Sequence, residues 1–155
     1  MSKRLGMISV AIAAMLALGV ITPAAGSTGG VTKDRTIRVS AVITELSLID
    51  AGTAGPSLGD EIVFSNKLLA GGKEIGHEGA VCTTVSLQRQ EAQCVATFSF
   101  SGGQITAQGL VSLGSLAPYA VPITGGSGKY NGAGGELQVH PVSGTEGILT
   151  LRLQG

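Results

Sequence analysis

Apolar and polar residues alternate along most of this chain. In the segment 36–50, Ile37, Val39 and Ala41 share one face if successive side chains point to opposite faces, as they do in a β-strand. Seven further segments show a similar pattern between Gly, Ser, Pro or Asn residues: 60–70, 73–87, 93–101, 103–113, 119–126, 135–144 and 147–154. This spacing is typical of an all-β sandwich or barrel, and no segment keeps a 3.6-residue apolar period long enough for a helix.

Eight strands are enough to close a sheet on itself. Closure removes the unpaired edges and leaves an interior that is either packed or just wide enough for one small ligand. The 25 glycines suit the tight turns and bends of strongly coiled strands. The pattern therefore predicts an all-β domain, either a sandwich or a closed antiparallel barrel of eight strands, with a flexible segment over 27–36 before it.

The first 26 residues have the pattern of a secretory signal peptide. Lys3 and Arg4 precede an uncharged run over 5–22, and small residues follow at 24–26. A retained transmembrane anchor is the alternative, because about 18 apolar residues are just able to span a bilayer. We favour cleavage after Ala25 or Gly26, which predicts a secreted protein without stable membrane anchoring.

The charge of the chain also limits the classes of partner that it can bind. The whole sequence has 10 basic and 10 acidic side chains, and removal of Lys3 and Arg4 with the leader leaves a slight acidic excess. A weakly acidic surface without a cluster of Lys and Arg is a poor match for nucleic acid or an anionic membrane. We expect a small, neutral or apolar partner.

Two cysteines lie in one predicted hairpin. The segment 79–100 has a polar tip, and if that tip is centred on Gln88, Cys82 faces Cys94 across the two strands. An oxidising compartment then favours a disulfide between them. Two reduced core cysteines are the alternative. Neither His77 nor His140 has ligand-like spacing to a cysteine, so we expect no metal site and no cofactor.

One polar residue interrupts an otherwise apolar strand face. In 60–70, Asn66 shares its face with Ile62, Phe64 and Leu68. A buried amide without a partner costs about 1 to 3 kcal/mol. Asn66 therefore either caps the strand end by bonding the backbone of the next turn, or orients a ligand or a water molecule inside the barrel.

Other residues are candidates for the barrel interior. The face of Cys94 continues through Phe98 and Phe100, and Tyr119 begins a strand from which its hydroxyl can reach the barrel mouth. Glu45, on the face of Ile43, is the one ionisable side chain to check. No catalytic residue is identified, and the candidate ligand-binding residues are Phe64, Asn66, Phe98, Phe100 and Tyr119.

Two polar features have structural interpretations. The glycine-rich segment 124–135 lacks the P-loop spacing, because Ile123 stands where a Gly is needed and Tyr130 replaces Ser or Thr after the Lys. We interpret it as a connection that wraps one barrel end, with Tyr130 packed against it. Asp60 is interpreted as a side chain that fixes a loop.

Three stretches resemble known proteins. The segments LGDEIVFSNKLL (58–69), GHEGAVC (76–82) and AVPITGGSGKYNGAGGELQV (120–139) are similar to allene oxide cyclases, and the third is also similar to dirigent proteins. The resemblance covers about residues 37–154. It implies that residues 37–155 form an eight-stranded antiparallel β-barrel of lipocalin-like outline. The superfamily's members steer cyclisation or coupling of apolar small molecules, often as dimers or trimers.

The resemblance extends to some site residues. Asn66 matches an asparagine that holds a water molecule near the substrate oxygen, and Cys82 matches a cysteine of the pocket wall. Glu45 matches the second of two glutamates, but the first, inward one falls on Val42 and a nearby asparagine falls on Thr44. The fatty-acid cyclisation of the plant enzymes is therefore not expected.

Three classes of function fit the sequence. The favoured one is an exported barrel that binds a small hydrophobic molecule and steers its cyclisation or coupling, with positioning as the main contribution to rate. The alternatives are a non-catalytic carrier and a structural barrel whose outer residues Val63, Val81 and Val85 are buried between subunits. The resemblance implies a homodimer or homotrimer. An ionisable side chain that points into the barrel favours the class that steers cyclisation or coupling. A barrel filled by its own side chains contradicts both that class and the carrier.

Overall fold

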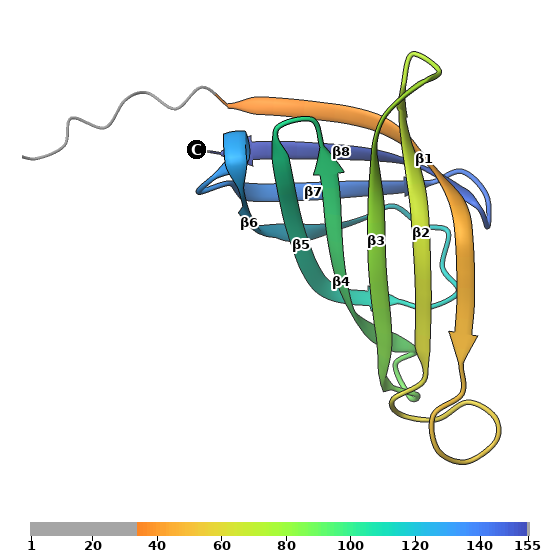
Figure 1. Cartoon of the computed structure of the whole chain (residues 1–155). Helices are drawn as coiled ribbons and strands as arrows, with labels where there is room; N and C mark the ends of the chain where they lie inside the picture. Colours follow the sequence, from red (N-terminus) through yellow and green to blue (C-terminus); the bar gives the residue numbers. More distant parts are fainter. Residues whose placement is uncertain (1–33, 155) are drawn as a thin grey trace, which may run out of the picture. The chain divides into compact units, whose positions relative to one another are not determined.

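A computed structural model describes residues 34–154 of the chain, and these residues form one closed antiparallel barrel. Figure 1 shows the strands placed around the barrel in chain order, with β1 beside β8. The strands are β1 (Arg35–Ile49), β2 (Glu61–Ala70), β3 (Lys73–Ser86), β4 (Glu91–Phe100), β5 (Gly103–Ser112), β6 (Tyr119–Gly126), β7 (Gly134–Pro141) and β8 (Glu146–Gln154).

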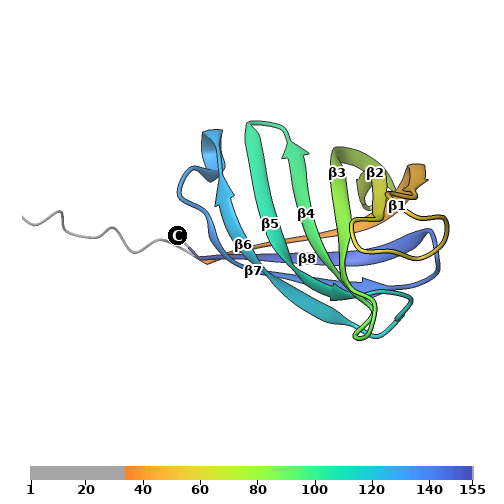
Figure 2. The same ribbon diagram turned by 90° about the horizontal axis from the view of Figure 1, so that it is seen from below.

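The predicted fold class is confirmed. All eight strands expected from the alternation are present, and the pairing of β1 with β8 closes the sheet. Figure 2 shows the same barrel turned by a right angle. The predicted signal peptide lies outside the described residues. The strand β1 begins at Arg35, two residues before the predicted start of the barrel domain. No helix within residues 34–154 is long and apolar enough to cross a membrane.

A bulge in β1 changes which side chains face inward. Ile43 is opposite Asn66 of β2, but the next paired residue is Glu45, opposite Ser65, so Thr44 is an extra residue without its own partner. An extra residue reverses the alternation of faces beyond it. Glu45 is consequently exposed on the outer face, and the expectation that it shares the inward face of Ile43 is wrong.

One end of the barrel is densely packed. Its centre consists of four side chains with relative exposure under 2%: Leu68, Phe98, Ile105 and Leu151. Deep burial of apolar side chains in close contact is the main source of stability in a domain of this size. We call this region the packed end.

A short 3₁₀ turn covers the packed end. The turn η1 (Gly128–Tyr130) follows β6 and buries Tyr130, whose ring lies 6.0 Å from that of Phe100. The backbone of η1 lies so close to the β4–β5 turn that a side chain at Gly128 would collide with the carbonyl of Gly102. The interpretation of the glycine-rich segment as a wrapping connection is confirmed.

The other end of the barrel is less completely paired. β1 pairs with β8 only as far as Val42, and the N–H of Ile43 still donates to the carbonyl of Thr145. From Glu45 to Ile49, β1 pairs with β2 alone. On the far side, β6 pairs with β5 only from Ile123 onward. Pro122 has no N–H to donate, which suits an unpaired strand edge. We call this region the open end.

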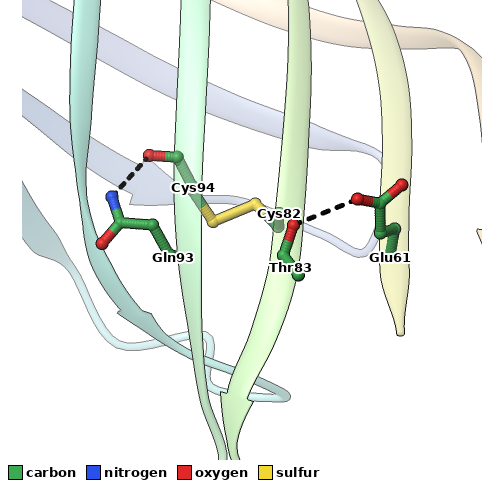
Figure 3. The surroundings of a disulfide bond; sticks show 5 residues. All are labelled: Glu61, Cys82, Thr83, Gln93 and Cys94. Carbon is green, nitrogen blue, oxygen red and sulfur yellow. Dashed lines mark hydrogen bonds between the residues drawn. A yellow bond between two sulfur atoms is a disulfide. The ribbon is translucent and has the colours of Figure 1, made fainter. Parts of the chain in front are cut away.

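The hairpin of β3 and β4 carries the predicted disulfide. Cys82 and Cys94 are directly opposite in the strand register and are joined by an S–S bond. Figure 3 shows the bond crossing between the two neighbouring strands. The predicted pairing of Cys82 with Cys94 is therefore present in the structure.

The loop between β1 and β2 is organised by Asp60. Its carboxylate accepts hydrogen bonds from the backbone N–H of Ala51 at 3.0 Å and from the N–H and hydroxyl of Ser57, each at 2.7 Å. These bonds, first of all those from Ser57, lower the pKa of Asp60. The predicted loop-fixing role is confirmed.

Candidate functional site

The open end of the barrel contains a cavity of about 170 Å³. Side chains from β1 to β8 contribute to its wall, and most of them are apolar. The barrel is thus filled at one end and hollow at the other. A completely filled interior, which would contradict both ligand-binding classes, is not what the structure shows. The apolar part of the wall includes Ala41, Ile43, Phe64, Val121, Leu137 and Leu149.

Two polar side chains meet in this apolar wall. Asn66 on β2 and Glu78 on β3 are opposite one another in the register. The amide Nδ2 of Asn66 donates a hydrogen bond to Oε2 of Glu78 at 2.7 Å. Only 7% of Asn66 and 6% of Glu78 are exposed. The apolar wall therefore holds one enclosed polar spot, the Asn66–Glu78 pair.

Glu78 has an unusual protonation equilibrium. Burial raises the pKa of its carboxyl to about 7, and the hydrogen bond from Asn66 offsets only part of the increase. Burial acts this way because it disfavours the charged form of an acid. Among the described residues that line the cavity, none is Lys, Arg or His. Near neutral pH, Glu78 is therefore present in both its protonated and its ionised forms.

Tyr119 lies at the edge of the same cavity. It begins β6, lines the cavity and is 37% exposed, as expected for a side chain at the mouth. Burial, and to a smaller extent the negative charge of Glu78, raise the pKa of its phenol. Tyr119 is therefore a neutral hydroxyl at ordinary pH, able to donate or accept a hydrogen bond.

The predicted ligand-binding residues separate into two groups. Phe64, Asn66 and Tyr119 line the cavity together. Phe98 and Phe100 face inward as expected, but they lie in the packed end, where Phe98 is fully buried and Phe100 contacts Tyr130. The expectation that all five surround one ligand space is not met, because only the first three reach the cavity.

The interpretation of Asn66 as a strand-end cap does not fit the structure. Its Nδ2 bonds a carboxylate on the neighbouring strand rather than the backbone of the following turn. Cys82 and Cys94 also line the cavity, which places the matched cysteine in the wall as the resemblance implies. Its sulfur is part of the disulfide.

Glu78 is the site residue that the sequence reasoning missed. The neighbouring His77 is exposed, and the two residues face apart, as the alternation predicts. The same alternation places Glu78 on the face of Ala80 and Cys82, both of which are buried. The signal was therefore present: an acidic residue four positions before Cys82, which was assigned to the pocket wall.

The remaining polar residues do not add a second centre. His77 and His140 are both exposed, on β3 and β7. Within residues 34–154, no three side chains of His, Cys, Asp or Glu gather in a way that would hold a metal ion. Glu146, at the start of β8, is the other carboxylate in the cavity wall. What this arrangement offers chemically is hydrogen bonding and proton exchange in an apolar space.

Comparison with protein families gives one clear match. Residues 37–150 match the model described as the allene oxide cyclase barrel like domain. No match was found among the curated proteins. The match covers nearly all of the barrel and extends from β1 into β8.

Several solved structures are similar to this chain. One titled pyocyanin demethylase has 30% identity and a TM-score of 0.69, and the match covers 77% of this chain and 100% of that one. The Diels–Alderase AbmU from Streptomyces koyangensis has 17% identity and a TM-score of 0.65, over 77% and 63% of the two chains. The pterocarpan synthase dirigent protein GePTS1 has 18% identity and a TM-score of 0.62, over 78% and 88%. The last two show the likeness of fold.

Proposed function

The chain belongs to the allene oxide cyclase barrel-like family, and from this premise we propose that it binds a small hydrophobic molecule at the open end of the barrel and steers its cyclisation or coupling. The ligand lies in the cavity of about 170 Å³, against the apolar wall. For comparison, an apolar cavity of about 150 Å³ is large enough for a benzene ring. The cavity therefore takes one ring, and the rest of a larger molecule extends through its mouth.

The single observation that carries the proposal is the buried Glu78. A carrier of apolar molecules needs only an apolar wall, and burial of a carboxyl in that wall costs free energy. Here the carboxyl is held by Asn66 and has a pKa raised to about 7. A group that exchanges its proton near the working pH is the requirement for general acid–base catalysis.

The proposed step is an isomerisation in which Glu78 returns to its starting state. The neutral carboxyl donates its proton to an oxygen or nitrogen of the substrate while the new ring bond forms. The resulting carboxylate then removes a proton from the cyclised intermediate. No electrons are exchanged and no atom is lost, so the step needs no co-reactant. The wall excludes water and holds the reacting atoms together, which supplies much of the rate.

The similar proteins support a role with small molecules. The three similar structures are those of a pyocyanin demethylase, a Diels–Alderase and a pterocarpan synthase dirigent protein. The demethylase has the highest identity of the three, 30%, and its whole chain is covered. Pyocyanin is therefore a useful first probe.

The first experiment identifies the natural ligand. The protein is purified from the culture medium of its own host and examined by native mass spectrometry, which reveals a bound small molecule as a defined mass increase. The ligand or its precursor is then incubated with the protein and with Glu78→Gln. We expect ring closure with the protein, a large loss of rate with Glu78→Gln, and the normal rate with Glu45→Gln, which changes an exposed outer carboxylate.

Two results would contradict the proposal. Recovery of the ligand unchanged, with product stereochemistry the same with and without protein, would identify a carrier. Loss of the methyl group from pyocyanin, followed by mass spectrometry, would identify a demethylase and would exclude a function limited to isomerisation.

We also propose that the protein is exported and self-associates. The disulfide is compatible with an oxidising compartment. On the outer face, Val63, Val81 and Val95 lie in one row across β2, β3 and β4, and the last two are 38% and 47% exposed. Sequencing of the secreted protein should give a new N-terminus after residue 25 or 26. Sedimentation should show a dimer or trimer that Val81→Lys dissociates.

A further inference from the structure

The Asn66–Glu78 pair has more acceptor atoms than donors. Nδ2 of Asn66 donates to Oε2 of Glu78, whereas Oδ1 of Asn66 is buried and has no hydrogen-bond partner among the described residues. The other carboxylate oxygen of Glu78, Oε1, also takes part in none of the hydrogen bonds recorded within residues 34–154. An ionised carboxylate and an amide oxygen accept hydrogen bonds and donate none.

No positively charged side chain in the cavity wall offsets this excess of hydrogen-bond acceptors. The ionisable side chains that line the cavity are Glu78, Tyr119 and Glu146, and none of them carries a positive charge. A buried acceptor without a donor costs about 1 to 3 kcal/mol. The pair is therefore a site that a donor from outside the chain would stabilise.

We infer that the ligand carries an N–H or O–H group and places it against the Asn66–Glu78 pair. This inference rests on the proposed function, because it names the chemical class of the molecule bound in that cavity. The class is that of apolar ring compounds with one donor at their inner end, such as phenols, pyrroles and lactams. When Glu78 is ionised, ring compounds whose polar atoms are all acceptors, such as ethers, epoxides and simple ketones, bind more weakly, because the carboxylate has no proton to donate to them.

The discrimination has a physical origin in desolvation. A ligand with a donor replaces its lost bond to water with a bond to the carboxylate, and bonds to charged groups are among the stronger ones. A ligand without a donor also displaces water from the oxygens of Asn66 and Glu78, but it forms no hydrogen bond with them in its place. Sites that are built to bond an N–H or O–H group reject analogues that lack it for this reason.

Indole and benzofuran provide a direct test. The two molecules have the same shape, and an N–H in indole is replaced by an oxygen in benzofuran. The chain contains no Trp, so the fluorescence of indole has no tryptophan background, and calorimetry measures both probes. At pH 8.5, where Glu78 is ionised, we expect indole to bind about tenfold or more tightly than benzofuran.

Two variants assign the effect to the pair. Glu78→Gln keeps the size of the side chain, removes the charge and adds a donor, so we expect the ratio of the two affinities to fall to about threefold or less. Glu45→Gln makes the same chemical change on the outer face and should keep the tenfold preference. Circular dichroism of both variants confirms that the barrel has folded.

The outcomes separate the inference from the proposed function. Equal binding of the two probes to the unmodified protein overturns the donor requirement and leaves the binding of apolar molecules intact. A preference that persists in Glu78→Gln also overturns it, because the donor then binds elsewhere. If neither probe binds, both the inference and the proposed function are contradicted.

Discussion

The packed end and the open end of the barrel use the same eight strands in different ways. At the packed end, β1 pairs with β8 and β5 with β6, and Leu68, Phe98 and Ile105 fill the interior. At the open end, β1 and β6 each lose one partner strand, and the interior is a cavity with a polar spot. The densest packing and the candidate site therefore lie at opposite ends of one barrel, so removal of a side chain should have different consequences at each end.

The largest expected effect is a loss of stability at the packed end. Phe98 has no exposed surface, so Phe98→Ala should lower the free energy of unfolding by about 3 to 5 kcal/mol. Phe64→Ala, in the partly exposed cavity wall, should cost less than half as much because less contact area is lost. Urea unfolding of the two variants measures the difference. Equal losses would contradict the division into two ends.

A second large effect concerns pH at the open end. The pKa of Glu78 is raised to about 7 from an ordinary 4.5, so between these values the folded state binds more protons than the unfolded state. The contribution of Glu78 to the free energy of unfolding should therefore be complete below about pH 4.5 and should decrease as the pH rises to about 7. The loss is on the order of 3 kcal/mol. The other ionisable groups of the cavity wall are Tyr119 and Glu146. Both are kept in Glu78→Gln, the variant that tests this prediction.

Glu78→Gln should remove most of this pH dependence. Because glutamine does not ionise, the variant should be more stable than the unmodified protein at pH 8 and similar to it at pH 4.5. Glu45→Gln, at the outer face, should keep the original dependence. Chemical unfolding at several pH values measures all three proteins. A Glu78→Gln variant that loses stability between pH 5 and pH 7 as steeply as the unmodified protein would show that another group titrates there.

The disulfide should contribute less than the buried Phe98. Cys82 and Cys94 are separated by 12 residues, and a loop of this size predicts a stabilisation of about 2 to 3 kcal/mol. Replacement of both by Ala should lower the melting temperature under oxidising conditions and make it insensitive to a reductant. The unmodified protein, treated with the same reductant, is the control and should approach the variant. If the melting temperature of neither the double variant nor the reduced protein is lowered, strand pairing alone holds this part of the open end together.

The smallest effect is on the phenol at the cavity mouth. Burial first and the charge of Glu78 second raise the pKa of Tyr119. Tyr119 and Tyr130 are the two tyrosines in the sequence, so ultraviolet titration of Tyr130→Phe follows Tyr119 alone. We expect ionisation above the ordinary pKa of about 10, and a smaller shift when Glu78→Gln is added. An unshifted titration would indicate that the mouth is fully solvated.

Much of the fold follows from local pattern. The alternation of faces gave the eight strands, and the position of the polar tip gave the pairing of Cys82 with Cys94. The role of Asp60 and the burial of Tyr130 were also predictable, because turn chemistry and glycine content act over a few residues. The likeness of three stretches to allene oxide cyclases added the closed barrel, and the family match confirms it.

The site depended on features that no short segment contains. The bulge at Thr44 turns Glu45 outward, and a bulge arises from the pairing of two strands rather than from the sequence of one. Glu78 and Asn66 are 12 residues apart in the chain and meet because β2 and β3 pair in one register. Phe98 and Phe64 both face inward, yet only Phe64 reaches the cavity. Alternation specifies the side of the sheet on which a residue lies, whereas its depth along the barrel and its neighbours across the interior depend on how all eight strands close.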